Sequence, residues 1–229
     1  MVMQASQMTL WAVGGDEYAP AVLEELGQHF KSVMYTERCG DLKTFSSLQE
    51  RAEYEAGLVI NAANDLDVFL FLDSPAQDYA ITAAEPDEII KATSRQIAQL
   101  LAYSKAASRV FTQSKKSGHI VSVCDVAGVA GRHDMTTIAS TSGAIIGFIK
   151  SMAKELGRYS ITANVVCYGF LENAEIRTHI SQAEHQLLDA SGLGKPTTLR
   201  NLALSVAYLS EVGNNATGQV LRVDSGLFI

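Results

Sequence analysis

Three side chains that could do chemistry lie near the middle of the chain: Cys124, Asp125 and His133. A thiol becomes a nucleophile when a neighbouring base takes its proton, so Cys124 with His133 as its base is one possible catalytic pair. A second thiol, Cys167, could complete a redox pair with Cys124, or a metal site with help from His133 or His179. Buried cysteines are more often small apolar residues, so a structural role is the simpler interpretation of both thiols.

The elements that must position these residues alternate between short apolar runs and longer helical patterns. This alternation is typical of a parallel sheet with helices on both faces, so we expect a single α/β, doubly wound domain over residues 1–229 with a mostly seven-stranded sheet. The expected strands are 9–13, 32–35, 57–61, 67–72, 119–124, 162–167 and 219–223. The clearest expected helices are 20–30, 92–113, 137–157 and 199–210.

Composition narrows the classes of function. The 229 residues carry a net charge of −7 and are 47% hydrophobic, which suits one globular domain and argues against binding to nucleic acid or anionic membranes. The apolar runs are far shorter than the roughly 20 residues of a membrane span, and no leader pattern precedes them, so we expect a cytoplasmic protein. Three widely spaced cysteines favour reduced thiols.

Two stretches resemble the short-chain dehydrogenase/reductase family. Residues 118–170 read GHIVSVCDVAGVAGRHDMTTIASTSGAIIGFIKSMAKELGRYSITANVVCYGF and resemble the second half of a family member. Residues 217–226, TGQVLRVDSG, resemble the family's closing strand. The resemblance implies a Rossmann-like fold, with the nucleotide site of the family falling within residues 9–75.

The catalytic positions of that family are changed here. The family uses a Ser and a Tyr that bind the substrate oxygen, and a Lys one helical turn beyond the Tyr that lowers its pKa. An ungapped match of IASTSGAIIGF to the family's YSASKAAVIGF places Ile138 at the Tyr position and Ser142 at the Lys position. The Ser position falls on Asp125, and the family's Asn falls near Gln96 or Ile97. We therefore expect no catalytic residue of the family's kind.

The turn after the first strand, which binds the nucleotide in the family, also differs from the family's sequence. The family has TGxxxGxG, whereas residues 13–20 here read VGGDEYAP, so Gly14 remains while Tyr18 and Pro20 replace two glycines beside the phosphates. Asp16 and Glu17 would repel a pyrophosphate, by about 3 kcal/mol for a carboxylate about 5 Å away at an effective dielectric of about 20. We expect that this chain binds no nucleotide and no metal.

Two further positions belong to the same region. The family's NNAG turn corresponds to Phe71-Leu72-Asp73-Ser74 in this chain. Glu37 is the only acidic residue close to the end of the second strand, where an intact site binds the ribose of the nucleotide. With the rest of the site changed, a solvated loop charge is the simpler interpretation of Glu37.

A stripe of small residues runs along the expected helix 137–157 at steps of four. Small side chains let another helix approach closely, and members of the resembled family assemble through this helix and the one before it, 92–113 here. We therefore expect an assembly surface in both helices, with the small-residue stripe formed by Ala139, Gly143, Gly147 and Ser151.

These departures led to one main expectation and two alternatives. The main one is a non-catalytic subunit, a pseudoenzyme, that forms a heterotetramer with an active paralogue of the family, in which the paralogue holds NAD and oxidises a hydroxyacyl-CoA type of alcohol. Within the family, this pattern resembles the inactive subunits of heterotetrameric dehydrogenases such as that of anaerobic toluene degradation. The alternatives are a stand-alone enzyme with new chemistry at Cys124, Asp125 and His133, and a small-ligand sensor that uses the vacated cleft.

Overall fold

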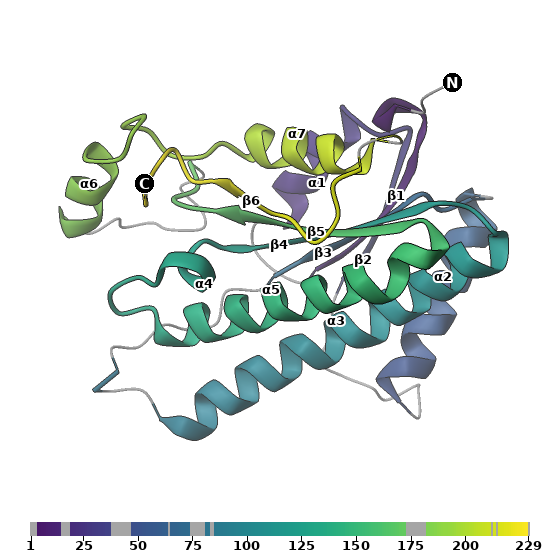
Figure 1. The fold of residues 1–229 in the computed structure, drawn as a ribbon, viewed down its shortest axis with the longest axis horizontal. Coiled ribbons are helices and arrows are strands. Elements are labelled where there is room, and N and C mark those ends of the chain that lie inside the picture. The colour runs from purple at the N-terminus through teal and green to yellow at the C-terminus, as the bar shows by residue number, and fades with distance from the viewer. Residues whose placement is uncertain are drawn as a thin grey trace.

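A single parallel sheet organises the computed structural model, which describes residues 4–14, 19–37, 47–63, 65–73, 81–82, 85–172, 182–211, 213 and 215–228. The sheet has six strands in the order β2-β1-β3-β4-β5-β6, and every neighbouring pair is parallel (Figure 1). This arrangement confirms the predicted α/β, doubly wound class. The strands are β1 (Thr9–Gly14), β2 (Ser32–Glu37), β3 (Val68–Leu72), β4 (Gly118–Asp125), β5 (Ile161–Tyr168) and β6 (Val220–Val223).

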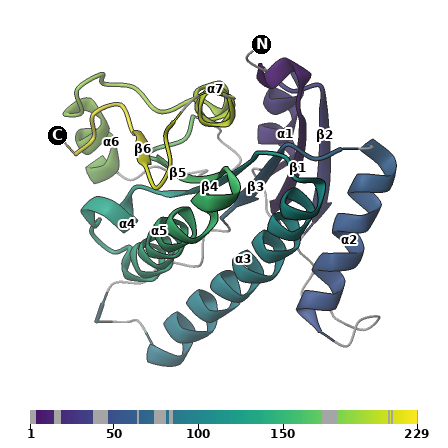
Figure 2. The same ribbon diagram turned by 45° about the vertical axis from the view of Figure 1, so that its right-hand side comes forward.

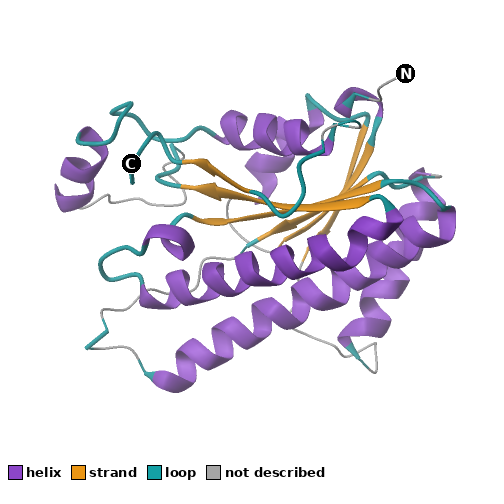
Figure 3. Cartoon of the chain, in the orientation of Figure 1, coloured by secondary structure: helices purple, strands orange, loops and turns teal. Residues whose placement is uncertain are grey.

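Helices cover both faces of the sheet (Figures 1 and 2). On one face lie α2 (Leu48–Ala63), α3 (Pro86–Ser114) and α5 (Thr136–Leu156), which Figure 3 shows as long helices below the strands. The other face carries α1 (Ala19–Gly27) and α7 (Leu199–Ser210). The shorter helices are η1 (Ala5–Gln7), α4 (Ala127–Ala130), η2 (Gly157–Tyr159) and α6 (Gln182–Asp189).

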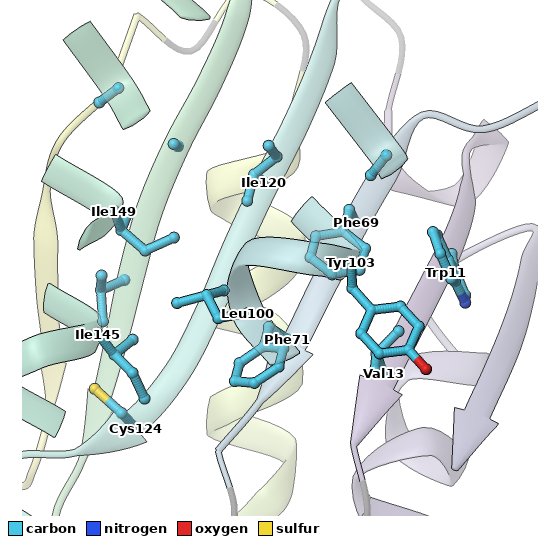
Figure 4. Packing of buried hydrophobic residues seen from close by; sticks show 14 of the residues in the cluster. Trp11, Val13, Phe69, Phe71, Leu100, Tyr103, Ile120, Cys124, Ile145 and Ile149 are labelled. Carbon is cyan, nitrogen blue, oxygen red and sulfur yellow. The ribbon is translucent and has the colours of Figure 1, made fainter. Parts of the chain in front are cut away.

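The larger core lies between the sheet and the α2, α3 and α5 layer. Trp11 of β1 packs edge-on against Phe69 at 5.3 Å and against Tyr103 at 5.8 Å between ring centroids. Figure 4 shows these rings at one side of the cluster and Cys124 with Ile145 at the other. Every residue of β1 and β3 is buried, because helices cover both faces of the sheet. These strands therefore appear in the sequence as continuous apolar runs rather than as an alternation of apolar and polar residues.

One predicted strand is wrong. Residues 57–61 lie in the second half of α2, so the sheet of the described residues has six strands rather than seven. A short apolar run fits a strand or a buried helix equally well, and here the burial of Ala52, Ala56 and Val59 follows helical spacing. An ion pair one helical turn apart, Arg51 to Glu55 at 2.8 Å, stabilises the same helix.

The other predicted elements are present with small shifts of their ends. The helix predicted at 199–210 is α7 with the same bounds, and its N-cap Thr198 forms a capping box with Asn201. The helix predicted at 92–113 begins earlier, because Pro86 and two acidic residues stabilise its first turn. Of the helices in the described ranges, none combines the length and apolar character needed to cross a bilayer.

Candidate functional site

The carboxyl end of β4 carries a buried ion pair. Asp125 is the last residue of the strand, and its carboxylate accepts a hydrogen bond of 2.7 Å from the backbone N–H of Ala127. Arg132, after α4, places its guanidinium 3.7 Å from the Asp125 carboxylate and 4.3 Å from the centroid of the Phe170 ring. Both charged side chains are at most 5% exposed. The carboxylate and the aromatic face therefore fix the position and orientation of the guanidinium at this end of the strand.

A second polar pair joins α5 to the end of β3. The hydroxyl of Ser142 donates a hydrogen bond of 3.4 Å to the carboxylate of Asp73, the residue that follows β3. Both residues are buried, and the backbone N–H of Asp73 bonds to the carbonyl of Val123. Ser142, which the sequence match predicts at the family's Lys position, therefore directs its hydroxyl at a carboxylate.

The predicted Tyr position is apolar in its surroundings as well as in its side chain. Ile138 is 4% exposed and packs with Ala127 and Met135, so α5 begins on a small hydrophobic cluster beside the ion pair. Next to it, the buried hydroxyl of Thr137 has no hydrogen-bond partner. The structure thus brings Asp125, Ile138 and Ser142 to the same edge of the sheet, and their predicted roles as altered catalytic positions stay a prediction.

Gln96 and Ile97 of α3 are the two residues that the sequence match places near the family's Asn, and Gln96 is the more buried of them. Gln96 is 2% exposed, whereas Ile97 is half-buried against the main core. One turn before it, Thr93 shares a hydrogen bond of 3.2 Å with Thr141 of α5. These contacts fix α3 and α5 side by side beneath the ends of the central strands.

Cys124 and His133 do not form the catalytic pair that the sequence suggested. The side chain of His133 is 94% exposed and contacts the neighbouring Asp134 at 2.8 Å. Cys124 is fully buried, and its thiol lies 3.7 Å from that of Cys167. The Cys167 contact, burial and two nearby carboxylates raise the pKa of the Cys124 thiol well above its ordinary value, so it is protonated at neutral pH.

The metal alternative has no assembled ligand set among the residues that the structure describes. No group of three or more His, Cys, Asp or Glu side chains in these ranges could hold an ion. His179, the other ligand considered, lies outside the described residues.

The nucleotide side of the site is described in part. Gly14 ends β1, and a Cβ there would lie 3.0 Å from the Cβ of Leu72, so the glycine permits close packing of β1 on β3. The strand register places Glu37 opposite Gly14, with its side chain exposed. Pro20 is the second residue of α1 and is also exposed. Asp16 and Glu17, predicted to repel a phosphate, and Tyr18, predicted to replace a glycine, lie outside the described residues, as does Ser74.

The small-residue stripe of α5 is used within the chain at its first half. A Cβ on Gly128 of α4 would lie 2.6 Å from the Cβ of Ser142 and 2.7 Å from the backbone nitrogen of Gly143, so the close approach of α4 to α5 requires glycine at position 128. A Cβ on Gly143 itself would lie at an ordinary contact distance of 3.7 Å from the carbonyl oxygen of Gly128. Further along, Gly147 and Ser151 are exposed, and a Cβ on Gly147 would meet nothing within 4 Å. Assembly of this chain with another through the stripe stays a prediction.

Arg132 and Phe170 were not singled out from the sequence. Arg132 falls in a loop without a motif, and its contact with Phe170 joins positions that are distant along the chain. The only available signal was the presence of a basic residue a few positions beyond an acidic strand end.

Comparison with known proteins identifies the family. Residues 43–228, most of the chain, match the family described as Enoyl-(Acyl carrier protein) reductase. The 3-oxoacyl-[acyl-carrier-protein] reductase FabG of Chlamydia trachomatis is 22% identical over 228 residues, covering 98% of this chain and 88% of that protein. The reductase of the same name from Escherichia coli is 26% identical over 212 residues, covering 92% of this chain and 83% of the relative.

Solved structures show the same fold. A short-chain type dehydrogenase/reductase from Mycobacterium marinum superposes with a TM-score of 0.79 at 15% identity, covering 98% of this chain and 96% of the other. An ElxO variant with NADPH bound gives a TM-score of 0.78 at 20% identity, covering 96% and 99% of the two chains.

These comparisons overturn the expectation of a non-catalytic subunit, because the relatives that align with nearly the whole chain are named as reductases. The predicted changes at the Tyr and Lys positions concern two side chains, and other buried polar groups lie at the strand ends. Nothing in the comparisons supports the narrower resemblance to a heterotetramer of anaerobic toluene degradation. The parallel sheet, its likeness to a solved dehydrogenase/reductase structure and the match over residues 43–228 together place this chain in the short-chain dehydrogenase/reductase family.

Proposed function

We propose that this chain is an oxidoreductase that interconverts a ketone and an alcohol on an acyl thioester, with a nicotinamide nucleotide as the hydride carrier. The observation that carries the proposal is the buried pair of Asp125 and Arg132 at the carboxyl end of β4, the edge at which open α/β sheets bind ligands. The names of the relatives support the substrate class, because two of them are 3-oxoacyl-[acyl-carrier-protein] reductases.

The reaction requires a donor for the substrate oxygen. In the reducing direction the carbonyl carbon gains a hydride, the π bond to oxygen breaks, and the oxygen gains a proton. Arg132 stabilises the negative charge that develops on the oxygen, because its guanidinium donates several hydrogen bonds. It keeps its own proton at all ordinary pH values, so the proton that completes the alcohol comes from water. Asp125 positions Arg132 and takes no part in the bond changes.

The described residues fit the ribose of a nicotinamide nucleotide at one position. Glu37 lies opposite Gly14 at the carboxyl edge, and an exposed carboxylate there can accept hydrogen bonds from ribose hydroxyls. The same carboxylate repels a 2′-phosphate, which favours NAD over NADP. When bound, the nucleotide supplies or accepts the hydride. The prediction that this chain binds no nucleotide remains untested, and it is the outcome that would contradict the proposal.

A spectrophotometric assay on the full chain tests the proposal. Acetoacetyl-CoA is supplied with NADH or NADPH, and oxidation of the reduced nicotinamide is followed by its absorbance. We expect turnover with a preference for NADH, and a smaller preference in Glu37→Gln. No turnover of acyl thioesters together with no NADH binding by calorimetry would refute the proposal.

Arg132→Lys separates the role of the guanidinium from that of the charge. Lysine keeps the positive charge near Asp125 but loses the planar fork, so we expect kcat to fall by about a hundredfold with little change in the KM for NADH. Arg158→Lys is the matched control, because Arg158 also stacks on an aromatic ring, that of Tyr159 at 4.8 Å, but is exposed and lies in η2, after the end of α5. Equal activity of Arg132→Lys and wild type would exclude Arg132 as the oxygen-binding group.

A further inference from the structure

Cys124 and Cys167 form a dithiol between two central strands. The two residues are register partners in the parallel pair of β4 and β5, and their sulfur atoms lie 3.7 Å apart. Both side chains are fully buried. The proposed reaction uses neither thiol, so the pair is a chemical group without a function in the site described above.

We propose that Cys124 and Cys167 are an oxidative modification site, at which a peroxide converts the dithiol to a disulfide between β4 and β5. Neighbouring strands lie about 4.8 Å apart, which falls within the roughly 4.4–6.8 Å that a disulfide spans between Cα atoms. The sulfur atoms must approach from 3.7 Å to a bond length of about 2.05 Å, a movement that rotation about the two Cα–Cβ bonds can supply.

The reaction balances as a two-electron oxidation. The first thiol loses its proton, the thiolate attacks a peroxide oxygen, and the O–O bond breaks. The departing hydroxide takes up that proton, so a sulfenic acid and one water are formed. The second thiol then attacks that sulfur, the S–S bond forms, and the hydroxyl leaves as a second water. Because the second sulfur is already in contact with the first, the disulfide forms before the sulfenic acid can be oxidised further.

Burial determines how fast this site reacts and with what. The thiolate is the reacting species, and the surroundings of Cys124 disfavour it, among them the carboxylates of Asp73 and Asp125. The reaction is therefore slow and open only to a small, uncharged oxidant such as hydrogen peroxide. A site of this kind responds to sustained exposure and ignores a brief one.

The disulfide would reach the proposed active site through the next residue of each strand. Asp125 follows Cys124, and Tyr168 follows Cys167 and accepts a hydrogen bond of 2.8 Å from the N–H of Val126. Rotation of the two side chains into the disulfide changes the packing beside the carboxylate that positions Arg132, so oxidation should lower activity. This last step rests on the proposed function, whereas formation of the disulfide does not.

Mass spectrometry of the full chain tests the site without an activity assay. The folded protein is treated with hydrogen peroxide, the peroxide is removed with catalase, and the chain is unfolded in an alkylating agent and digested without reductant. We expect a peptide pair linked through Cys124 and Cys167, with the mass of two hydrogens lost, and its disappearance after dithiothreitol.

Three variants make the result specific. Cys39→Ser should form the linked pair as wild type does, whereas Cys124→Ala and Cys167→Ala should not; each alanine variant is first checked for folding by circular dichroism. Three outcomes would overturn the proposal. The first is sulfinic or sulfonic acid at either position without the linked pair, and the second is a link to Cys39 instead. The third is complete alkylation of both thiols when wild type that was treated with peroxide while folded is then unfolded. If the disulfide forms but the chain shows no turnover, the proposed function fails and the modification site stands.

Discussion

The two ends of β4 bury ionisable side chains in opposite ways. At the carboxyl end, Asp125 is compensated by the N–H of Ala127 and by the guanidinium of Arg132. At the amino end, His119 is 4% exposed and bonds to Thr162 through one ring nitrogen at 2.9 Å, while its Nε2 has no hydrogen-bond partner. The strand therefore holds a paired charge at one end and a neutral ring at the other.

The two ends of β4 therefore differ in whether a charged group is present at neutral pH. Burial lowers the pKa of His119 to about 4, so the ring is neutral at physiological pH and has no proton to give. The carboxyl end keeps a permanent positive charge at Arg132, held next to its counter-ion. A buried charge persists only where its partners are fixed, which is the condition that a binding site also needs.

The largest expected effect is loss of one partner at the carboxyl end. Arg132→Ala leaves the Asp125 carboxylate buried without its counter-ion, so we expect the free energy of unfolding to fall by about 3–5 kcal/mol in urea titrations. Arg158→Ala, at an exposed position, should change it by less than about 0.5 kcal/mol. Equal losses in both variants would mean that the buried pair contributes nothing beyond an ordinary surface residue.

His119, at the amino end of β4, should make the stability of the chain depend on pH. The folded pKa of His119 lies below its unfolded value of 6.5, so the unfolded chain binds a proton that the folded chain does not, and stability falls as pH drops from 6.5 towards 4. The full shift corresponds to about 3 kcal/mol.

His119→Gln isolates this contribution, and urea titrations at neutral and acidic pH measure it. Burial raises the pKa of Asp67 in the folded chain, so the folded chain binds a proton at this residue more readily than the unfolded chain does. This residue therefore adds stability as the pH falls, which is opposite to the effect of His119. Asp67 is present in both proteins, so the difference between wild type and His119→Gln removes its effect. His133→Gln, at an exposed ring, is the control; a pH dependence unchanged by His119→Gln would show that this ring is not responsible.

A smaller effect is expected where α4 packs on α5, just beyond the carboxyl end of β4. Gly128→Ala places a Cβ within 2.7 Å of the backbone nitrogen of Gly143, and backbone cannot rotate away as a side chain can. We expect a loss of about 1–3 kcal/mol in the free energy of unfolding, measured by thermal or urea unfolding. An unchanged stability would mean that α4 can move away from α5 without loss.

Much of the fold could be predicted from the sequence, because periodicity records which face of each element is buried. The strands that became β1 and β3 and the helix α7 follow from continuous apolar runs and a capping signal. The strand predicted at 57–61 failed because its short apolar run, residues 58–60, carries no period of its own, and only the neighbouring Ala52 and Ala56 mark the helix.

The candidate site could be predicted less well. The positions of Asp125, Ile138 and Ser142 followed from an ungapped match, and the structure places them at one edge of the sheet. Their chemistry depends on partners from other elements, such as Asp73 for Ser142 and Phe170 for Arg132, and these contacts leave no spacing in the sequence. The non-catalytic interpretation was wrong because it rested on single motif positions, whereas relatives that align with nearly the whole chain are named as reductases.

The smallest expected effect lies on α5 away from both ends of β4, at the exposed glycine of the stripe. A Cβ on Gly147 meets no atom within 4 Å in the isolated chain, and alanine is the better helix former, so Gly147→Ala should raise the free energy of unfolding by about 0.5–1 kcal/mol. The same substitution also tests the predicted assembly surface. If a second chain approaches closely at Gly147, the larger Gly147→Leu lowers the mass measured by light scattering while the isolated fold stays intact. If both variants keep the mass of wild type, the stripe is not a contact between chains, and its role is limited to the packing of α4 on α5.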